Sequence, residues 1–371
     1  MKGWHGMNKN VVKFNLPCSQ GIIKLIAETD GEFIKSVEPP DIGYLHRGLE
    51  KAAESRTYLQ YLPIVDKIDC VSGFIYQEAF CSAVEKLCSI DVPVKAQYIR
   101  VLLMELTRIS SHLFWLGTYL RNLGACFPAF YAFKERELIL QIFEELNGQR
   151  LMLNFHKFGG VKHDLNQNII GEIENFLKIL PNRLFEYENI LNDNPIFTGK
   201  TKGIGILSKK SALNYSVTGA NLRASGVALD VRKSCPYLVY DKINFDIPTQ
   251  KEGDCYSRYL QRMGEIKQSA DIVSQCLEYI KSSNEEIFNP EINRTNIKPE
   301  ENTVVSYVES SRGLVSCTLV SDGSEIPYRV KWRTSSFYSV QILPFLLKNR
   351  YVSDIMSIFG SLDIMMTEVD R

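Results

Sequence analysis

Hydrophobic and polar positions divide the chain into a short β-rich beginning and a long helical part. Three short apolar runs, at 11–14, 21–26 and 32–34, have the length and turn-rich boundaries of strands. Asp30-Gly31 is a strong tight-turn signal between the second and third runs. Pro39-Pro40 then ends this pattern. We therefore expect a small antiparallel sheet within residues 1–40, followed by a helical core over 41–285.

The helical core contains one long segment between Pro93 and Gly124, which are typical first and last residues of a helix. Apolar residues occupy most of its circumference, so we expect it to be a central, buried helix. Its polar residues form a narrow row on one side. The members of this row are Arg100, Thr107, Ser111, Thr118 and Asn122. Such a row either hydrogen-bonds to neighbouring helices or faces a cavity or interface, and the sequence leaves both interpretations open.

Other helices are predicted from apolar spacing near 129–148, 165–192, 252–283 and 352–359. The spacing of Leu45, Leu49, Ala52 and Ala53 predicts a further helix that begins near residue 43. We expect Pro63 to end that helical region and the next helix to begin near residue 66.

The C-terminal part changes character after residue 285. Residues 286–302 are polar and rich in Asn, Glu and Pro, which indicates a surface linker. Alternating runs at 313–320 and 327–332 flank Asp322-Gly323, so a β-hairpin and short helices are expected over 303–371. The predicted fold class is mainly α with two small antiparallel β elements, the N-terminal sheet and this C-terminal hairpin.

Composition and charge exclude several classes of function. Lys plus Arg equals Asp plus Glu, 43 of each, so no net charge attracts nucleic acid or an anionic membrane. No run reaches the roughly 18 apolar residues that a transmembrane helix needs. The first residues are too polar for a secretory signal, so we expect an intracellular protein that is at most peripheral to a membrane.

The cysteines and histidines predict no metal site. The nine cysteines are an odd number and include no Cys-x-x-Cys pair, which argues against a disulfide framework and against paired thiolate ligands. The five histidines show no zinc-site spacing. Gly203-Ile204-Gly205 lacks the third glycine of a dinucleotide loop, so we expect no NAD(H) site on this chain.

The order of several motifs resembles one known family. They are Gly43-Tyr44-Leu45-His46-Arg47-Gly48-Leu49-Glu50-Lys51, Arg56-Thr57-Tyr58-Leu59-Gln60, Val84-Glu85-Lys86-Leu87, Gly159-Gly160-Val161, Leu222-Arg223-Ala224-Ser225-Gly226, Asp230-Val231-Arg232-Lys233 and Glu368-Val369-Asp370-Arg371. Together they resemble the hydrogenase-large-subunit-like subunit of respiratory complex I (NADH-quinone oxidoreductase), including its plastid counterpart. The resemblance covers nearly the whole chain and is to the short form, without the helical insertion near 284–302. The implied fold is that of the nickel–iron hydrogenase large subunit without its metal site.

The resemblance implies a peripheral-arm subunit of a complex-I-like, proton-translocating oxidoreductase that is not catalytic alone. In that family the subunit packs against a small iron–sulfur subunit, and the two enclose a cavity for the quinone headgroup. The iron–sulfur cluster then belongs to the partner, and NAD(H) binds elsewhere. A further peripheral-arm subunit and the membrane-arm subunits of complex I would be additional partners. The implied location is the cytoplasmic face of the bacterial inner membrane, or the matrix or stromal side in an organelle.

Where the family carries its quinone-site side chains, this sequence differs. The family turn His-Pro-x-x-His-Gly is Leu16-Pro17-Cys18-Ser19-Gln20-Gly21 here, so Leu16 and Gln20 replace the two histidines. The tyrosine position is Cys70 and the aspartate position is Asn122.

Four further positions follow from the resemblance. Lys67 and Met152 occupy positions that face the partner's cluster, where arginine and, in some members, histidine occur. His46 and Arg47 of the first motif are expected to support the cavity.

Quinone reduction consumes two protons, and the replaced positions leave few groups to supply them. Cys70 is the weak catalytic candidate, because a thiol can titrate whereas the side chains of Leu16, Gln20 and Asn122 cannot. The alternative is that Cys70 only fills space. Three interpretations remain open: quinone reduction with altered proton delivery, a divergent subunit with a non-quinone acceptor, and a non-catalytic assembly scaffold.

Overall fold

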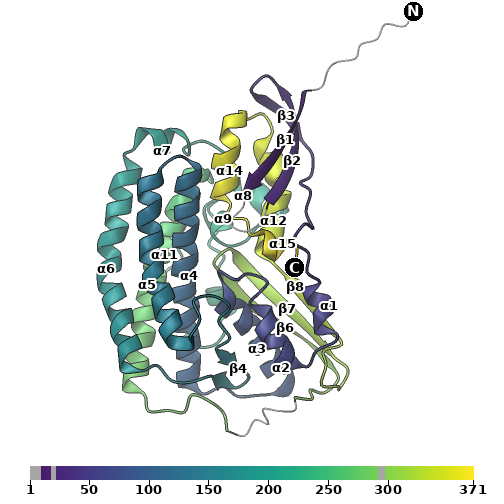
Figure 1. Ribbon diagram of the computed structural model, residues 1–371, viewed down its shortest axis with the longest axis vertical. Coiled ribbons are helices and arrows are strands. Elements are labelled where there is room, and N and C mark those ends of the chain that lie inside the picture. Colours follow the sequence, from purple (N-terminus) through teal and green to yellow (C-terminus); the bar gives the residue numbers. More distant parts are fainter. Residues whose placement is uncertain (1–9, 18–21, 291–296) are drawn as a thin grey trace, which may run out of the picture.

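The computed structural model describes residues 10–17, 22–290 and 297–371. Its largest part is a bundle of long helices, α4 (Val94–Asn122), α5 (Cys126–Asn147), α6 (Gln167–Asn192) and α11 (Cys255–Ser282) (Figure 1). Helix α4 packs against both α5 and α11, and α6 packs against the same two helices. Almost every side chain of α4 is buried. The predicted central helix is therefore confirmed.

The N-terminal sheet is also confirmed. Strands β1 (Asn10–Pro17), β2 (Ile22–Asp30) and β3 (Phe33–Val37) pair antiparallel in this order. Gly31 has a φ of 59°, the conformation that a tight turn after Asp30 requires. The buried side chains of β2 pack against short C-terminal helices, including α13 (Leu343–Leu347) and α14 (Ile355–Ser361). The two ends of the chain thus share one hydrophobic cluster.

The predicted C-terminal hairpin is part of a larger sheet. Strands β7 (Gly313–Ser321) and β8 (Arg329–Arg333) pair as expected, with Val330 and Trp332 buried between exposed Arg329 and Lys331. A third strand, β6 (Asn302–Ser310), pairs along the whole of β7. Helix α3 (Gly73–Cys88) packs against β6 and β7. Sequence analysis missed β6 because its polar start continues the composition of the preceding linker.

A third small sheet also corrects the predicted fold class. Strands β4 (His156–Lys157) and β5 (Gly160–Val161) form a two-stranded hairpin beside α3 and α4. Two-residue strands are too short to show alternation, so periodicity could not reveal them. The described chain is mostly helical with three small antiparallel sheets, not two β elements.

The predicted helix boundaries between residues 43 and 72 were wrong. Helix α1 (Leu49–Ala53) begins only after Gly48, whose φ of 61° is left-handed. Helix α2 (Tyr58–Val65) begins at a capping box formed by Thr57 and Gln60, and it contains Pro63 instead of ending before it. The next helix, α3, begins at Gly73, because residues 66–72 form turns. The capping box and the buried face of α2 offset the hydrogen bond that proline removes.

Between α6 and α11 the chain forms short helices and turns, and two more short helices follow β8. These are α7 (Pro195–Gly199), α8 (Lys209–Asn214), α9 (Ala220–Arg223), α10 (Val231–Ser234), α12 (Ser335–Gln341), the 3-10 turn Val352–Asp354 and α15 (Met366–Val369). Among the helices in the described ranges, none combines the length and apolarity that a membrane crossing needs.

Candidate functional site

A cavity of about 290 Å³ lies at the C-terminal end of α4, between that helix, α5 and the segment that follows α14. Aromatic rings form most of its wall, and Asn122 and Asp363 supply polar groups. The ring of Phe133 can lie directly against α4 because residue 117 is glycine: a Cβ there would be 2.8 Å from that ring. The lining residues are Phe114, Trp115, Thr118, Tyr119, Arg121, Asn122, Phe133, Phe359, Gly360, Asp363 and Ile364.

Both interpretations of the polar row on α4 hold, each for a different part of the helix. Arg100 pairs with Glu78 and Glu85 of α3, so the first turns use the row for inter-helix contacts. Thr107 and Thr118 donate their hydroxyl groups to carbonyl oxygens of α4 itself. Thr118 and Asn122 also line the cavity. The row therefore changes from structural contacts to a cavity wall toward the C-terminal end of α4.

Cys70 is connected to this cavity through buried ion pairs. It lies half-buried in the turn before α3, next to the fully buried Asp69. Arg312 Nη1 is 2.6 Å from Asp69 Oδ2, and Arg312 Nη2 is 3.4 Å from Oδ1 of Asp363, a cavity residue. Burial raises the pKa of Asp363, while Arg312 and Arg262 oppose that rise. The structure thus links two predicted site positions, Cys70 and Asn122, through residues that the sequence analysis did not assign.

Two arginines lie near the Cys70 thiol. Arg136 of α5 interacts electrostatically with Cys70, and its guanidinium carbon lies 5.0 Å from the centre of the Phe114 ring in the cavity wall. Arg47 also interacts with Cys70 and with Asp370. Burial lowers the pKa of both guanidinium groups, an effect that their interactions with Cys70 oppose. Sequence analysis could not distinguish Arg136 from its charged neighbours on α5, because it has no periodic or motif signal of its own.

His46 and Arg47 hold the first motif to the end of the chain. The Asp370 carboxylate accepts hydrogen bonds from the backbone N–H groups of Gly43 and Leu45, at 2.8 and 2.9 Å. His46 Nδ1 lies 2.8 Å from the Asp370 carbonyl oxygen. Arg47 donates to the carbonyl oxygens of Lys67 (2.7 Å) and Thr367 (2.9 Å). The supporting role expected for these two residues therefore has a structural basis: they position the turn that leads to Cys70.

The remaining predicted positions are less closely associated with the cavity. Lys67 Nζ is 3.1 Å from Oδ1 of the buried Asp66, and burial raises the pKa of that carboxyl. Met152 is 44% exposed and has a positive φ of 59°. Leu16 lies in β1 opposite Ile23, and Gln20 falls outside the described residues. The cavity is therefore assembled from Asn122 and the Cys70 side, not from all predicted positions.

A buried cluster of four ionisable side chains supports the loop that follows Met152. Arg100 lies 2.7 Å from Glu85 and 3.2 Å from Glu78, and it donates to the carbonyl oxygens of Lys157 and Gly160. His156 Nδ1 lies 3.5 Å from Glu78 Oε2. Burial raises the pKa of Glu78 to about 7 and lowers that of His156 well below its usual value. The conformation of the β4–β5 hairpin is thus coupled to protonation inside the molecule.

We expect the Glu78→Gln variant to lose less stability than the parent between pH 6 and pH 8. A carboxyl whose folded-state pKa is about 7, above its unfolded value of 4.5, stabilises the fold fully below pH 4.5 and loses that contribution as pH rises through 7. The loss attributable to Glu78 over this window is about 1–2 kcal/mol. His156 acts in the opposite sense, because its stabilisation is lost as pH falls below about 6.5.

Urea unfolding at pH 6, 7 and 8 measures this difference, with Glu252→Gln as the exposed control. The parent and the control should lose the same free energy of unfolding over the window. A parallel decline in Glu78→Gln would show that Glu78 does not titrate there.

Comparison with known proteins identifies the family. The family described as "Respiratory-chain NADH dehydrogenase, 49 Kd subunit" matches residues 122–371. A protein of Geobacillus thermodenitrificans is 43% identical over 355 residues, which are 95% of this chain and 96% of that relative. The chain belongs to this family. A protein of Bacillus cereus is 42% identical over the same length, and both relatives are named as one and the same subunit of NADH-quinone oxidoreductase.

The resemblance seen in the motif order is thereby confirmed, and with it the enzyme class, a subunit of NADH-quinone oxidoreductase. Across residues 10–17, 22–290 and 297–371, the structure contains no group of three or more His, Cys, Asp or Glu that could hold a metal ion. The side chains around the α4 cavity are aromatic rings, amides, arginines and one carboxyl. These groups suit an organic ligand better than a metal ion.

Proposed function

We propose that this chain, together with a small iron–sulfur subunit, encloses the cavity in which electrons pass to quinone in NADH-quinone oxidoreductase. The observation that carries the proposal is the convergence of Asn122, Asp363 and the Cys70 turn at one end of α4. These positions lie far apart in the sequence, yet two of them are the positions that the family resemblance assigns to quinone.

The α4 cavity suits the headgroup of a quinone. A flat ring can pack against the aromatic wall, where Trp115 and Tyr119 stack with their ring centres 5.1 Å apart. The carbonyl oxygens of a quinone accept hydrogen bonds, and the Asn122 amide can donate one. Asp363 can hold a proton at a higher pH than an exposed aspartate does, because burial raises its pKa. It thereby joins Cys70 as a candidate for proton supply.

Exposed aromatic residues beside the cavity support the proposed partner. Phe127, Phe130 and Tyr131 lie at the start of α5, immediately after the turn that follows Asn122, and are 81%, 68% and 52% exposed. Large exposed aromatic side chains next to a polar site are typical of a protein interface. The small iron–sulfur subunit is the partner we assign to this surface. Its cluster would supply the electrons, while this chain supplies the cavity and proton-holding groups.

In this proposal the chain is peripheral to the membrane, on the cytoplasmic side of a bacterial inner membrane or the equivalent side in an organelle. A further peripheral-arm subunit and the membrane-arm subunits complete the assembly, and NAD(H) is oxidised elsewhere in it. Lys67 and Met152 face the partner's cluster, and Leu16 and Gln20 complete the quinone side of the cavity.

Substitutions of Cys70 test the proposal directly. If Cys70 contributes to proton delivery, Cys70→Ala lowers quinone-dependent turnover, whereas Cys70→Tyr, which introduces the family's phenol, is tolerated and raises it. We expect the decrease to reach about tenfold, the lower end of what general acid catalysis contributes. The measurement is quinone reduction in membranes that carry each variant, with assembly verified separately.

Cys235→Ala, an exposed cysteine elsewhere in the chain, is the matched control and should behave as the parent. Equal turnover in the Ala, Tyr and parent proteins would remove Cys70 from the mechanism but leave the cavity in place. A fully assembled parent complex that reduces no quinone would contradict the proposed function, in favour of another acceptor or a scaffold role.

A further inference from the structure

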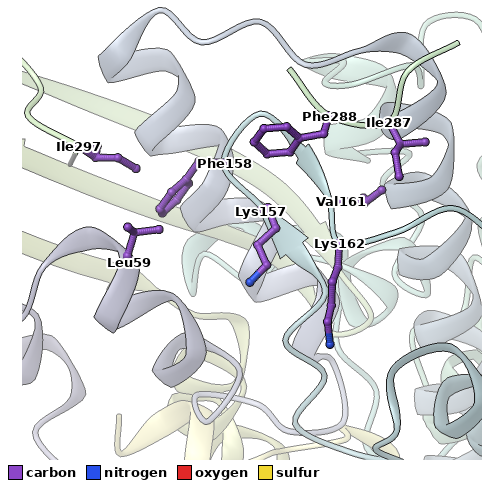
Figure 2. A pocket seen from close by; sticks show the side chains of 8 residues that line it. All are labelled: Leu59, Lys157, Phe158, Val161, Lys162, Ile287, Phe288 and Ile297. Atoms are coloured by element: carbon purple, nitrogen blue, oxygen red, sulfur yellow. The ribbon is translucent and has the colours of Figure 1, made fainter. Parts of the chain in front are cut away.

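A second cavity, of about 430 Å³, lies between α2, the β4–β5 hairpin and the segment that follows α11 (Figure 2). It shares no lining residue with the cavity at the end of α4. Six of its lining side chains are apolar and two are lysines, and none is acidic. The lining residues are Leu59, Phe158, Val161, Ile287, Phe288, Ile297, Lys157 and Lys162.

The walls of this cavity are fixed by backbone hydrogen bonds. Val161 N–H donates to the Ile287 carbonyl oxygen at 3.1 Å, and Asn289 N–H donates to that of Gly159 at 2.9 Å. The segment after α11 therefore continues the β4–β5 hairpin. At Gly160 a Cβ would lie 2.3 Å from the Ile287 carbonyl oxygen, so only glycine permits this close approach. Arg100 binds the hairpin from its other side. The cavity is thus largely preformed, as small-molecule sites usually are.

The two lysines give the cavity one charged side. Figure 2 shows the amine ends of Lys157 and Lys162 extending to the same side, away from Phe288 and Ile287. Lys162 Nζ donates to the neutral amide oxygen of Asn147 at 3.1 Å, which leaves its charge uncompensated by that contact. Two ammonium groups beside a rim without lining carboxylates attract an anion.

We propose that this cavity binds an amphipathic anion: one acyl chain that carries a carboxylate or phosphate head. The chain would pack against Leu59, Phe158 and Phe288, and the head would bind Lys157 and Lys162. The cavity volume is near the lower end of the roughly 300–1,000 Å³ of ligand sites, which fits a single chain and not a two-chain lipid in full. A neutral quinone would make no use of the two ammonium groups, so this site differs in chemistry from the α4 cavity.

Calorimetric titration of the purified full-length chain with dodecanoate tests the proposal, with dodecanol as the neutral probe of the same chain length. We expect saturable dodecanoate binding, and we expect the double variant Lys157→Ser/Lys162→Ser to weaken it by about tenfold or more. The matched control is Lys267→Ser/Lys281→Ser, which removes two half-exposed lysines of α11 and should leave the affinity unchanged. If the double variant does not fold, the exposed Lys162→Ser alone serves as the test.

Further arms separate the sources of the ligand. Dodecyl phosphate should compete with dodecanoate, because the lysines recognise the charge of the head. Competition by phosphatidylglycerol vesicles would identify a membrane lipid as the natural source, and its absence would identify a free acyl anion. The proposal is overturned if the parent binds no dodecanoate, if dodecanol binds equally well, or if the lysine variant retains full affinity.

Discussion

Replacing Arg312 with methionine is expected to destabilise the chain by about 3–5 kcal/mol, the loss found when one partner of a buried ion pair is removed. The Arg312 guanidinium lies between Asp69 and Asp363, at 2.6 and 3.4 Å, and all three side chains are at most 2% exposed. Methionine keeps much of the apolar volume but leaves two buried carboxyl groups without their shared cation. The two carboxyl groups must then take up protons or admit water, and both responses favour unfolding.

Denaturant unfolding of the purified chain measures the effect, and Arg329→Met is the control. Arg329 also pairs with a carboxylate, Glu54 at 2.9 Å, but its side chain is 48% exposed, so we expect a loss of only about 0–1 kcal/mol. Arg312→Lys should recover part of the stability because it restores a charge without the two-sided geometry. Equal losses in Arg312→Met and Arg329→Met would show that the buried network contributes nothing beyond a surface pair.

Arg312 also relates stability to the proposed function. Since it joins the Cys70 turn to the cavity residue Asp363, its loss should lower quinone-dependent turnover even in complexes that still assemble. Turnover per assembled complex separates this effect from simple loss of protein. An assembled Arg312→Met complex with parental turnover would mean that the ion pairs stabilise the fold but do not position the cavity.

The second large effect is expected from Gly219→Ala. Gly219 has φ 71° and ψ −151°, a region of backbone conformation that is essentially restricted to glycine. A Cβ at this position would lie 2.4 Å from both the Arg312 carbonyl oxygen and Gly313 Cα. The backbone before α9 thus lies directly against the turn that joins β6 and β7. We expect a loss of about 3 kcal/mol or more, because backbone strain and overpacking add at the same atom.

Gly48→Ala is the matched control for this prediction. Gly48 is also left-handed, with φ 61°, but a Cβ there would meet nothing within 4 Å. Its substitution therefore carries the conformational penalty alone, about 1–2 kcal/mol. The free energies of unfolding of both variants and the parent decide the matter. If the two substitutions prove equally destabilising, then the contact between the α9 and β6–β7 segments can relax at little cost.

The sequence by itself determined the features that depend on neighbours within a few residues. Apolar positions around most of its circumference were enough to predict the buried helix α4, and Asp30-Gly31 was enough to place the turn of the N-terminal sheet. The order of motifs was enough to predict the family. In contrast, the helix predicted from residue 43 was wrong, because the backbone there hydrogen-bonds to Asp370 instead of forming helical turns.

Only the tertiary structure decided how the candidate site is built. Asp69 and Arg312 are 243 residues apart in the sequence, and their contact has no local signal that periodicity could report. Arg136 and Asp363 became candidates only when packing placed them near Cys70 and Asn122. The physical reason is the range of the interactions. Helix and turn preferences act over three or four residues, whereas burial and ion pairing depend on which distant surfaces the folded chain brings together.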